Sequence, residues 1–398
     1  MSELLQVRRL SIVFIMLVVV LGLPGYTAAA PADESEPAFS WQDAMDNLDL
    51  QSLEEFKSQM DGEENLFLQN KSVKEWMADF AQGNWKLDFK QVAEGLIRYL
   101  FKEIVANSSL LSKLIILSVL SALLINLQSS FGTGVGKISY MVCFLALCAL
   151  ALGSFKVALS IGHQTIDNMA DFMVSMLPPM MMLVAGLGNV NSAAMLFPIL
   201  MTAASAFAHA IKVIVFPLII MSALLSLANH VSETVKVERM AKFCTQIAQI
   251  SLGFFLTIFV GLVTLRALYA SVLDKVALRT TRFITDNAIP VVGKMVGDTI
   301  EVAAGYVVML KDAMGIFGVL IIMGIIIFPI IKIAALGLIY KLVGAIVEPM
   351  GDHKTAAILE VMSTHLMLLM AATASVGFMF FIMITILAGM SNNLTMLR

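Results

Sequence analysis

Charged side chains inside apolar stretches are the residues of this sequence whose chemistry is most informative. Lys212 lies between two apolar stretches, and Lys311 and Asp312 lie inside another. A charge in the middle of a bilayer is costly, so such residues usually face a cavity or a partner. The three are candidates for an internal ion pair or an ion path, and they form no obvious proton relay. The simpler alternatives are that Lys212 snorkels to the headgroups and that a helix boundary lies near Lys311.

The sequence carries no motif for catalysis, metal binding or cofactor binding. Its five histidines lack metal-ligand spacing, and its Ser, His and Asp residues occur without a nucleophile elbow. Residues 131–137 imitate a phosphate-binding loop, but Phe131 replaces its first glycine and Ile138 replaces its Ser or Thr. The three cysteines make no disulfide framework. We therefore expect no enzyme, no cofactor and no metal site.

Prolines in apolar segments form a second group of candidates. Pro178 and Pro179 lie in the short segment 172–187, and Pro290 lies in the short segment 284–297. Proline removes a helix donor, and a membrane tolerates this only where protein or water replaces it. Each segment therefore either re-enters the membrane or spans it. The remaining candidates are Pro217, Pro329, Asn189 and Asn191 for a hinge or path, and Gly293 and Gly297 for close helix packing.

The elements that must position these residues are apolar helices. The 398 residues are 59% hydrophobic and only 14% charged, whereas a soluble domain has about 25% charged residues. The net charge of −3 and the lack of a basic tract give no indication of nucleic-acid binding. We predict an all-α, polytopic helical membrane protein with about eight spans of roughly 20 residues each. The expected spans are 110–127, 138–159, 191–211, 213–229, 246–270, 303–323, 325–341 and 366–389.

The N-terminus has the order of a secretory signal. Arg8 and Arg9 precede an apolar run that Pro24 and Gly25 close, and small residues follow as far as Ala32. The run is too short for a typical spanning helix. We expect a signal peptide over residues 1–32, and the alternative is an uncleaved anchor. Either would deliver the following residues across the membrane.

Residues 33–107 form an acidic, polar module in which three short helices are expected. Its three tryptophans, Trp41, Trp76 and Trp85, predict either a small helical bundle with an aromatic core or a docking surface for a partner, and both can be true. We expect this module outside the cytoplasm. Residues 108–165 are expected to form a first helical hairpin.

Spacing along the remaining chain suggests an internal duplication. Pro178 and Pro217 are 39 positions apart, and so are Pro290 and Pro329. We therefore interpret residues 170–270 and 282–390 as two membrane repeats, and the alternative is a chance alignment of apolar, proline-containing sequence. Re-entrant proline segments would make the repeats inverted, as in many transporters, and spanning ones would make them parallel.

Several stretches resemble the stage III sporulation protein AE family of endospore-forming bacteria. They are Met176–Met182 (Met-Leu-Pro-Pro-Met-Met-Met), Leu196-Phe197-Pro198, Lys212–Pro217 and Ser226–Ser232. The likeness covers most of the chain after about residue 90 and is weaker before it. None of these stretches is catalytic, so they point to a family and not to a reaction.

The resemblance implies a subunit of the complex that links mother cell and forespore, regarded as a channel or secretion-like apparatus. It implies as partners other stage III sporulation proteins of the same operon and a forespore membrane protein, with the N-terminal module between the two membranes. A homo-oligomer of this chain is a further alternative that the sequence leaves open. The alternatives are a non-conducting membrane scaffold and an independent secondary transporter. Polar residues facing each other across the repeats would favour conduction, and a continuous apolar interior would favour the scaffold.

Overall fold

The structure is a computed structural model, and it describes residues 50–51, 53–55, 72–81, 89–131, 133–187, 189–231, 236–288 and 292–389. All of them belong to one compact unit, residues 38–398. The ordered elements are α4 (Val73–Ala81), α5 (Phe89–Ala106), α6 (Ser108–Phe131), α7 (Thr133–Gly186), α8 (Val190–Ala210), η2 (Ile211–Val215), α9 (Phe216–Val231), α10 (Glu238–Ala288), α11 (Val292–Val347), η3 (Glu348–Met350) and α12 (His353–Gly389). No strand occurs in the described part, and the predicted all-α fold class is confirmed.

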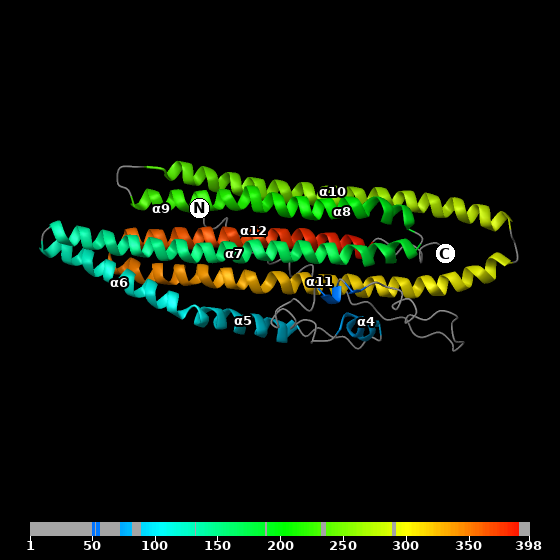
Figure 1. Cartoon of the computed structure of the whole chain (residues 1–398), viewed down its shortest axis with the longest axis horizontal. Helices are drawn as coiled ribbons and strands as arrows, with labels where there is room; N and C mark the ends of the chain where they lie inside the picture. Colours follow the sequence, from blue (N-terminus) through cyan, green and yellow to red (C-terminus); the bar gives the residue numbers. More distant parts are fainter. Residues whose placement is uncertain are drawn as a thin grey trace. The chain divides into compact units, whose positions relative to one another are not determined.

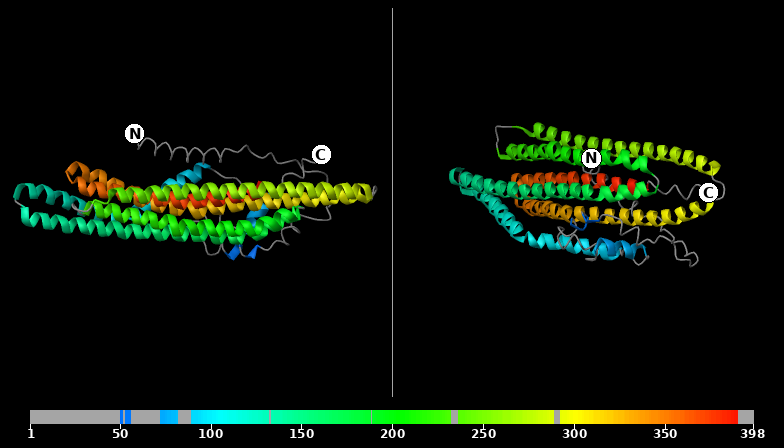
Figure 2. Two further views of the ribbon diagram at one scale, coloured as in Figure 1. Left: turned by 90° about the horizontal axis from the view of Figure 1, so that it is seen from above. Right: turned by 45° about the vertical axis from the view of Figure 1, so that its right-hand side comes forward.

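The long helices lie lengthwise beside one another (Figure 1). Helix α10 packs against α8 and α9, α7 packs against α8, α11 and α12, and α5 and α6 lie against α11. The most extensive contact joins α11 to α12, which follow each other in the chain. Two further views show the same lengthwise packing (Figure 2).

Six helical stretches in the described residues are long and apolar enough to cross a membrane. They are Ser108–Asn126, Ile138–Gly186, Val190–Val231, Glu238–Leu273, Gly305–Met350 and His353–Gly389. The chain is a polytopic helical membrane protein, and the expected count of eight needs correction. The expected spans 191–211 and 213–229 form one uninterrupted helical stretch, and 303–323 and 325–341 both lie in α11. Only one residue separates the members of each pair, which leaves no room for a turn.

The expected re-entrant turn at Pro178 and Pro179 is not formed. Both prolines lie inside α7, which continues to Gly186. The φ angle of proline is compatible with a helix, and the flanking residues Leu177 and Met180 are fully buried, so packing holds the helix together across the missing donors. Of the second expected segment, 284–297, residues 284–288 end α10 and residues 292–297 begin α11, and Pro290 lies outside the described residues between them.

Helices α7 and α11 are longer than one bilayer. At about 1.5 Å per residue, the apolar stretch Ile138–Gly186 is about 74 Å long, against a hydrocarbon core of about 30 Å. Within it, residues 138–155 and 172–186 contain no charged side chain, and the charges lie between them. Helix α7 therefore has two apolar parts joined by a polar middle.

The described part of the N-terminal module packs on α11. The ring of Trp76 in α4 lies 5.4 Å from that of Phe317, and the ring of Tyr99 in α5 lies 4.9 Å from that of Phe328. Leu53 joins the same buried cluster. Trp76 and Tyr99 therefore both contact α11. Trp41, Trp85 and the expected signal peptide 1–32 lie outside the described residues.

Candidate functional site

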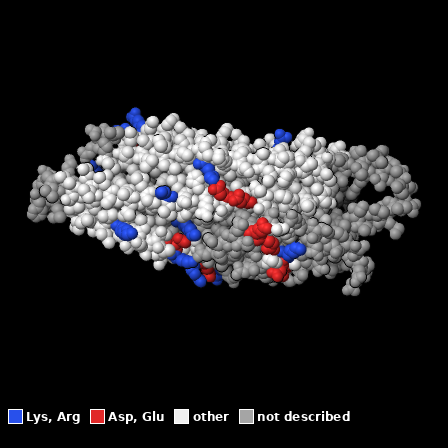
Figure 3. All heavy atoms as spheres, in the orientation of Figure 1, with Lys and Arg blue, Asp and Glu red and all other residues white. Residues whose placement is uncertain are grey.

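The candidate site lies in the polar middle of α7. Figure 3 shows Lys, Arg, Asp and Glu side chains gathered mainly toward the centre and the lower part of one face, while most of the described surface around them is uncharged. We call the charged and ionisable residues of the α7 middle, together with the lysine that they contact, the polar belt. Its members are Lys156, His163, Asp167 and Asp171 of α7 and Lys212 of η2.

An ion pair between α7 and η2 forms the centre of the polar belt. Lys212 Nζ lies 2.5 Å from Asp167 Oδ1, and the side chains are 22% and 55% exposed respectively. The predicted intramembrane charge at Lys212 is thus neutralised by a carboxylate on a neighbouring helix. Because Asp167 is more than half exposed, its other oxygen remains open to a partner outside the chain.

A π-helical turn carries Lys212. Residues Ile211–Val215 form η2, and the Phe216 backbone N–H donates to the carbonyl of Ile211. Pro217 lies two residues after this turn. In a regular α-helix its ring would collide with the carbonyl of the residue four positions earlier, and proline has no N–H to donate to that carbonyl. A wider turn relieves this conflict, and such turns are frequent at functional sites. The Phe216 ring also contacts His163 edge-on at 4.8 Å, so the turn touches α7 through two residues.

A second buried polar cluster joins α9, α10 and α12. Ser222 Oγ lies 2.9 Å from His365 Nε2 and 2.5 Å from Thr245 Oγ1. His365 Nδ1 lies 2.8 Å from the Val361 carbonyl. The Ser222 hydroxyl has a single proton and lies 2.9 Å from both the Ala241 carbonyl and His365 Nε2, so either atom can accept it. A Ser–His contact is also found in hydrolases, but Ser222 is completely buried and His365 nearly so. The cluster acts as a hydrogen-bonded link between three helices.

A buried carboxylate fixes the turn between α11 and α12. Asp352 is completely buried and precedes α12. Its Oδ1 accepts the Thr355 N–H at 3.0 Å and its Oδ2 accepts the Thr355 hydroxyl at 2.6 Å, which is N-cap geometry. Ser121 of α6 donates to Oδ2 at 2.5 Å, and Tyr140 of α7 donates to Oδ1 at 3.3 Å. One side chain thereby ties three helices, α6, α7 and α12, together at one end of the bundle.

The second predicted pair, Lys311 and Asp312, lies in α11. Lys311 is completely buried and its Nζ lies 3.6 Å from Asp312 Oδ1. The helix begins at Val292, well before this pair, so the alternative of a helix boundary at Lys311 is wrong. The pair neutralises charge within one helix.

The predicted prolines and asparagines do not gather into one site. Pro178 and Pro179 lie near the end of α7, Pro217 is the second residue of α9, and Pro329 lies in α11 beside Phe328. Asn189 precedes α8 and makes no side-chain cap bond, and Asn191 is exposed. Gly293 and Gly297 lie at the start of α11, but their surroundings are not described. Pro290 lies outside the described residues.

The interior of the bundle is apolar. The buried cluster runs through all the long helices and consists of aliphatic, aromatic and methionine side chains. Its polar interruptions are hydroxyls, His365, Lys311 and Asp352, and several of the hydroxyls bond within the bundle, as Ser363 does to the Gly337 carbonyl and Thr165 to the Ile161 carbonyl. Two cavities of about 540 Å³ and 200 Å³ lie between helices at the surface. Neither includes a residue of the polar belt, and neither joins the two ends of the bundle.

Sequence reasoning missed several of these residues. Asp167 is an ordinary acidic residue in a polar stretch, and only the packing of α7 on η2 makes it the partner of Lys212. Ser222 and His365 are 143 positions apart. Asp352 had a readable signal, because an Asp after a glycine and three residues before a threonine predicts a helix cap.

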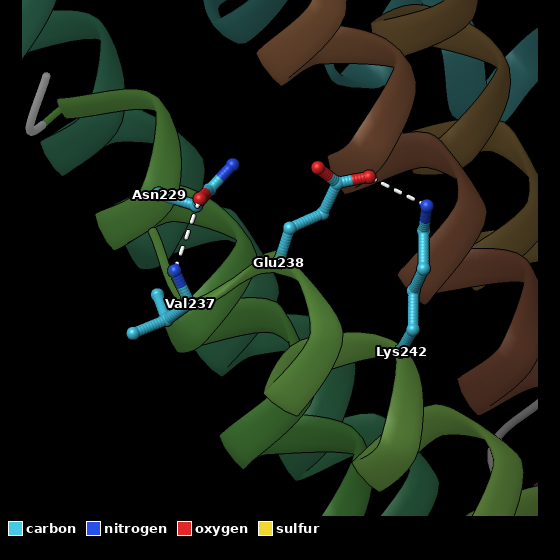
Figure 4. Close-up of polar contacts among 4 residues, drawn as sticks. All are labelled: Asn229, Val237, Glu238 and Lys242. Carbon is cyan, nitrogen blue, oxygen red and sulfur yellow. Dashed lines mark hydrogen bonds and ion pairs between the residues drawn. The ribbon is translucent and has the colours of Figure 1, made fainter. Parts of the chain in front are cut away.

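The turn between α9 and α10 contains one of the stretches that resemble the sporulation family. Asn229 accepts the Val237 backbone N–H at 3.2 Å through Oδ1, and Lys242 pairs with Glu238 at 2.5 Å (Figure 4). His230 Nδ1 bonds the Ser226 carbonyl at 2.7 Å. These contacts close the turn and start α10, so this stretch has a structural role.

Comparison with known proteins gives a consistent result. Residues 71–391 match the family model described as stage III sporulation protein AE. The chain is 36% identical over 327 residues to the Bacillus subtilis protein named stage III sporulation protein AE, which covers 82% of each chain. No solved structure matches the chain. The match contains every described helix from α4 to α12, and the chain therefore belongs to the stage III sporulation protein AE family.

Proposed function

We propose that this sporulation-related membrane protein is a subunit of the channel or secretion-like complex that links mother cell and forespore. The observation that carries the proposal is the family match, which extends over the entire helical bundle. By this proposal the protein is required for forespore development. Its partners are other stage III sporulation proteins of the same operon and a forespore membrane protein. Residues 33–107 lie between the two membranes.

The apolar interior restricts how such a subunit works. A conducting path needs polar groups or water along its length, whereas the described core of this chain is continuous and apolar. Any path would therefore form between chains, with this protein as part of the wall. Polar-belt residues that are exposed on the bundle, such as Asp167 and Lys156, would then face neighbouring subunits or the path.

The second candidate function is a membrane scaffold that holds partners and conducts nothing, and the same apolar interior favours it. An independent transporter has less support, because such proteins bind substrate at broken helices near the midplane, and α7 is unbroken at Pro178 and Pro179. Catalysis also lacks support, because the Ser222–His365 contact is buried.

The test is made in sporulating cells that lack the chromosomal gene. We expect arrested forespore development, rescue by the intact chain, and co-purification of sibling sporulation proteins with an affinity-tagged copy. Normal forespores without the gene would contradict the proposal. A variant without residues 33–107 but with its signal retained should insert normally and lose the partners, and retained partners would contradict the docking role of this module.

Movement of a small fluorescent tracer between the two compartments separates the two candidates. A channel subunit requires that tracer exchange is lost in cells without the gene. A scaffold that conducts nothing allows exchange to continue while partner assembly fails.

A further inference from the structure

The smaller of the two cavities lies between α8 and α10 and combines an apolar floor with a cation. Its lining consists of Met195, Leu196, Pro198 and Ile199 from α8 and Arg266, Tyr269 and Ala270 from α10. Arg266 and Tyr269 are both exposed, whereas Leu196 is almost completely buried. The cavity therefore has a charged, hydrogen-bonding rim and a hydrocarbon-like interior.

Arg266 ends a charge-free stretch of α10. Residues 243–265 contain no charged side chain, and at about 1.5 Å per residue they extend about 35 Å, close to the hydrocarbon thickness of a bilayer. Lys242 precedes this stretch and Arg266 follows it. The two cations therefore mark the two boundaries of one membrane crossing.

The two boundary cations differ in their partners. Lys242 is neutralised by Glu238 at 2.5 Å (Figure 4). Arg266 takes part in no ion pair within the described part of the chain. A guanidinium at headgroup depth beside an apolar cavity matches an anion that carries a hydrocarbon chain. Arginine binds phosphate through two parallel hydrogen bonds, and basic pockets between transmembrane helices bind anionic headgroups.

We propose that this cavity binds an anionic phospholipid of the surrounding bilayer. The Arg266 guanidinium binds the phosphate, the Tyr269 hydroxyl bonds the headgroup, and part of an acyl chain packs on Leu196 and Ile199. The larger cavity makes a contrast, because its lining includes Asn107 and Ser154 but no charged residue. It provides apolar contact without a group that selects an anionic headgroup.

The test uses the purified full-length protein in vesicles that contain phosphatidylglycerol or phosphatidylcholine with a photoactivatable acyl chain. Crosslinked peptides are identified by mass spectrometry. We expect the α8 and α10 peptides of this cavity to prefer phosphatidylglycerol about tenfold, the ratio that one extra charge-assisted contact of about 1.4 kcal/mol produces. Peptides of the larger cavity should show no such preference.

Variants separate headgroup recognition from general lipid contact. Arg266→Gln should abolish the preference, Arg266→Lys should retain part of it, and Arg239→Gln at the other end of α10 should leave it unchanged. Unlabelled phosphatidylglycerol should compete in the wild-type protein, which keeps the test independent of variant folding. Equal labelling by both lipids, or an unchanged preference in folded Arg266→Gln, would overturn the proposal.

Discussion

At the scale of single residues, the buried polar side chains lie where helices meet. Asp352, Ser222 and His365 each bond to at least one neighbouring helix. In hydrocarbon, a polar side chain without a hydrogen-bond partner raises the free energy of the folded protein. Each of these bonds therefore favours one arrangement of the helices over arrangements in which a helix has slid or rotated. Such residues stabilise a particular packing, which apolar contacts alone specify less strictly.

The Asp352 cluster leads to a prediction on stability. Asp352→Ala removes the α12 cap and leaves the hydroxyls of Ser121 and Thr355 without their acceptor. We expect the free energy of unfolding to fall by about 2–4 kcal/mol, measured by denaturant titration in bicelles. Asp171→Ala is the matched control, because Asp171 is an exposed residue of α7. Equal stabilities of the two variants would contradict the structure.

The ion pair of the polar belt is tested by exchange of its charges. Asp167→Lys places two cations together and should lower stability by about 1 kcal/mol, since the pair is partly exposed and screened by solvent. Adding Lys212→Asp restores opposite charges and should recover most of the loss in the same titration. A double variant that is less stable than both single variants would show that the side chains do not interact.

At the scale of elements, close packing of α11 and α12 depends on glycine. A Cβ atom at Gly377 would lie 2.1 Å from Cδ1 of Ile326. A Cβ atom at Gly253, on the outer face of α10, meets nothing within 4 Å. The two helices therefore approach each other most closely where one of them has no side chain, as expected for helices packed in a membrane.

This contrast gives a prediction with an internal control. Gly377→Ala should destabilise the protein by about 1–3 kcal/mol through overpacking, and Gly253→Ala should be neutral or slightly stabilising because alanine favours helix. Ile326→Val removes the closest atom and should offset part of the Gly377→Ala loss. Thermal unfolding in detergent checks all three, and an unaffected Gly377→Ala protein would be inconsistent with this packing.

The elements also show what sequence reasoning could and could not predict. Apolar length and composition identified the spanning helices, because both are local properties. Lys212 was identified for the same reason, as a charge within an apolar run. Its partner Asp167 was not, since the pairing depends on how α7 and η2 are rotated toward each other. Of the two alternatives left open for Pro178 and Pro179, a re-entrant turn and a continuous helix, the structure has the continuous helix, because burial on both sides outweighs the lost backbone bonds.

At the scale of the whole molecule, the order of helices is compatible with the expected duplication. A proline-containing helical stretch, α8 to α9, is followed by α10, and a second, α11, is followed by α12. Pro217 and Pro329 lie in the first member of each pair. The repeat stays a prediction, and the packing of α11 on α12 and of α9 on α10 supports it.

Packing of the N-terminal helices on α11 is testable by crosslinking. In a cysteine-free variant, Tyr99→Cys with Phe328→Cys should be joined by a short bis-maleimide crosslinker, because the two rings that these cysteines replace are 4.9 Å apart. Ile97→Cys with Phe328→Cys is the control, since Ile97 is 58% exposed. Equal yields from the two pairs would mean that α5 does not hold this position on α11.

This sporulation membrane protein has an apolar interior, so any path lies between chains. Site-by-site cysteine accessibility in a cysteine-free variant, probed with a membrane-impermeant maleimide in assembled complexes, distinguishes an apolar interior from a water-filled one. We expect buried positions such as Ala204, Ala223 and Ala372 to stay unlabelled, while exposed Lys236 in the turn before α10 is labelled. A continuous row of labelled core positions would contradict an apolar interior.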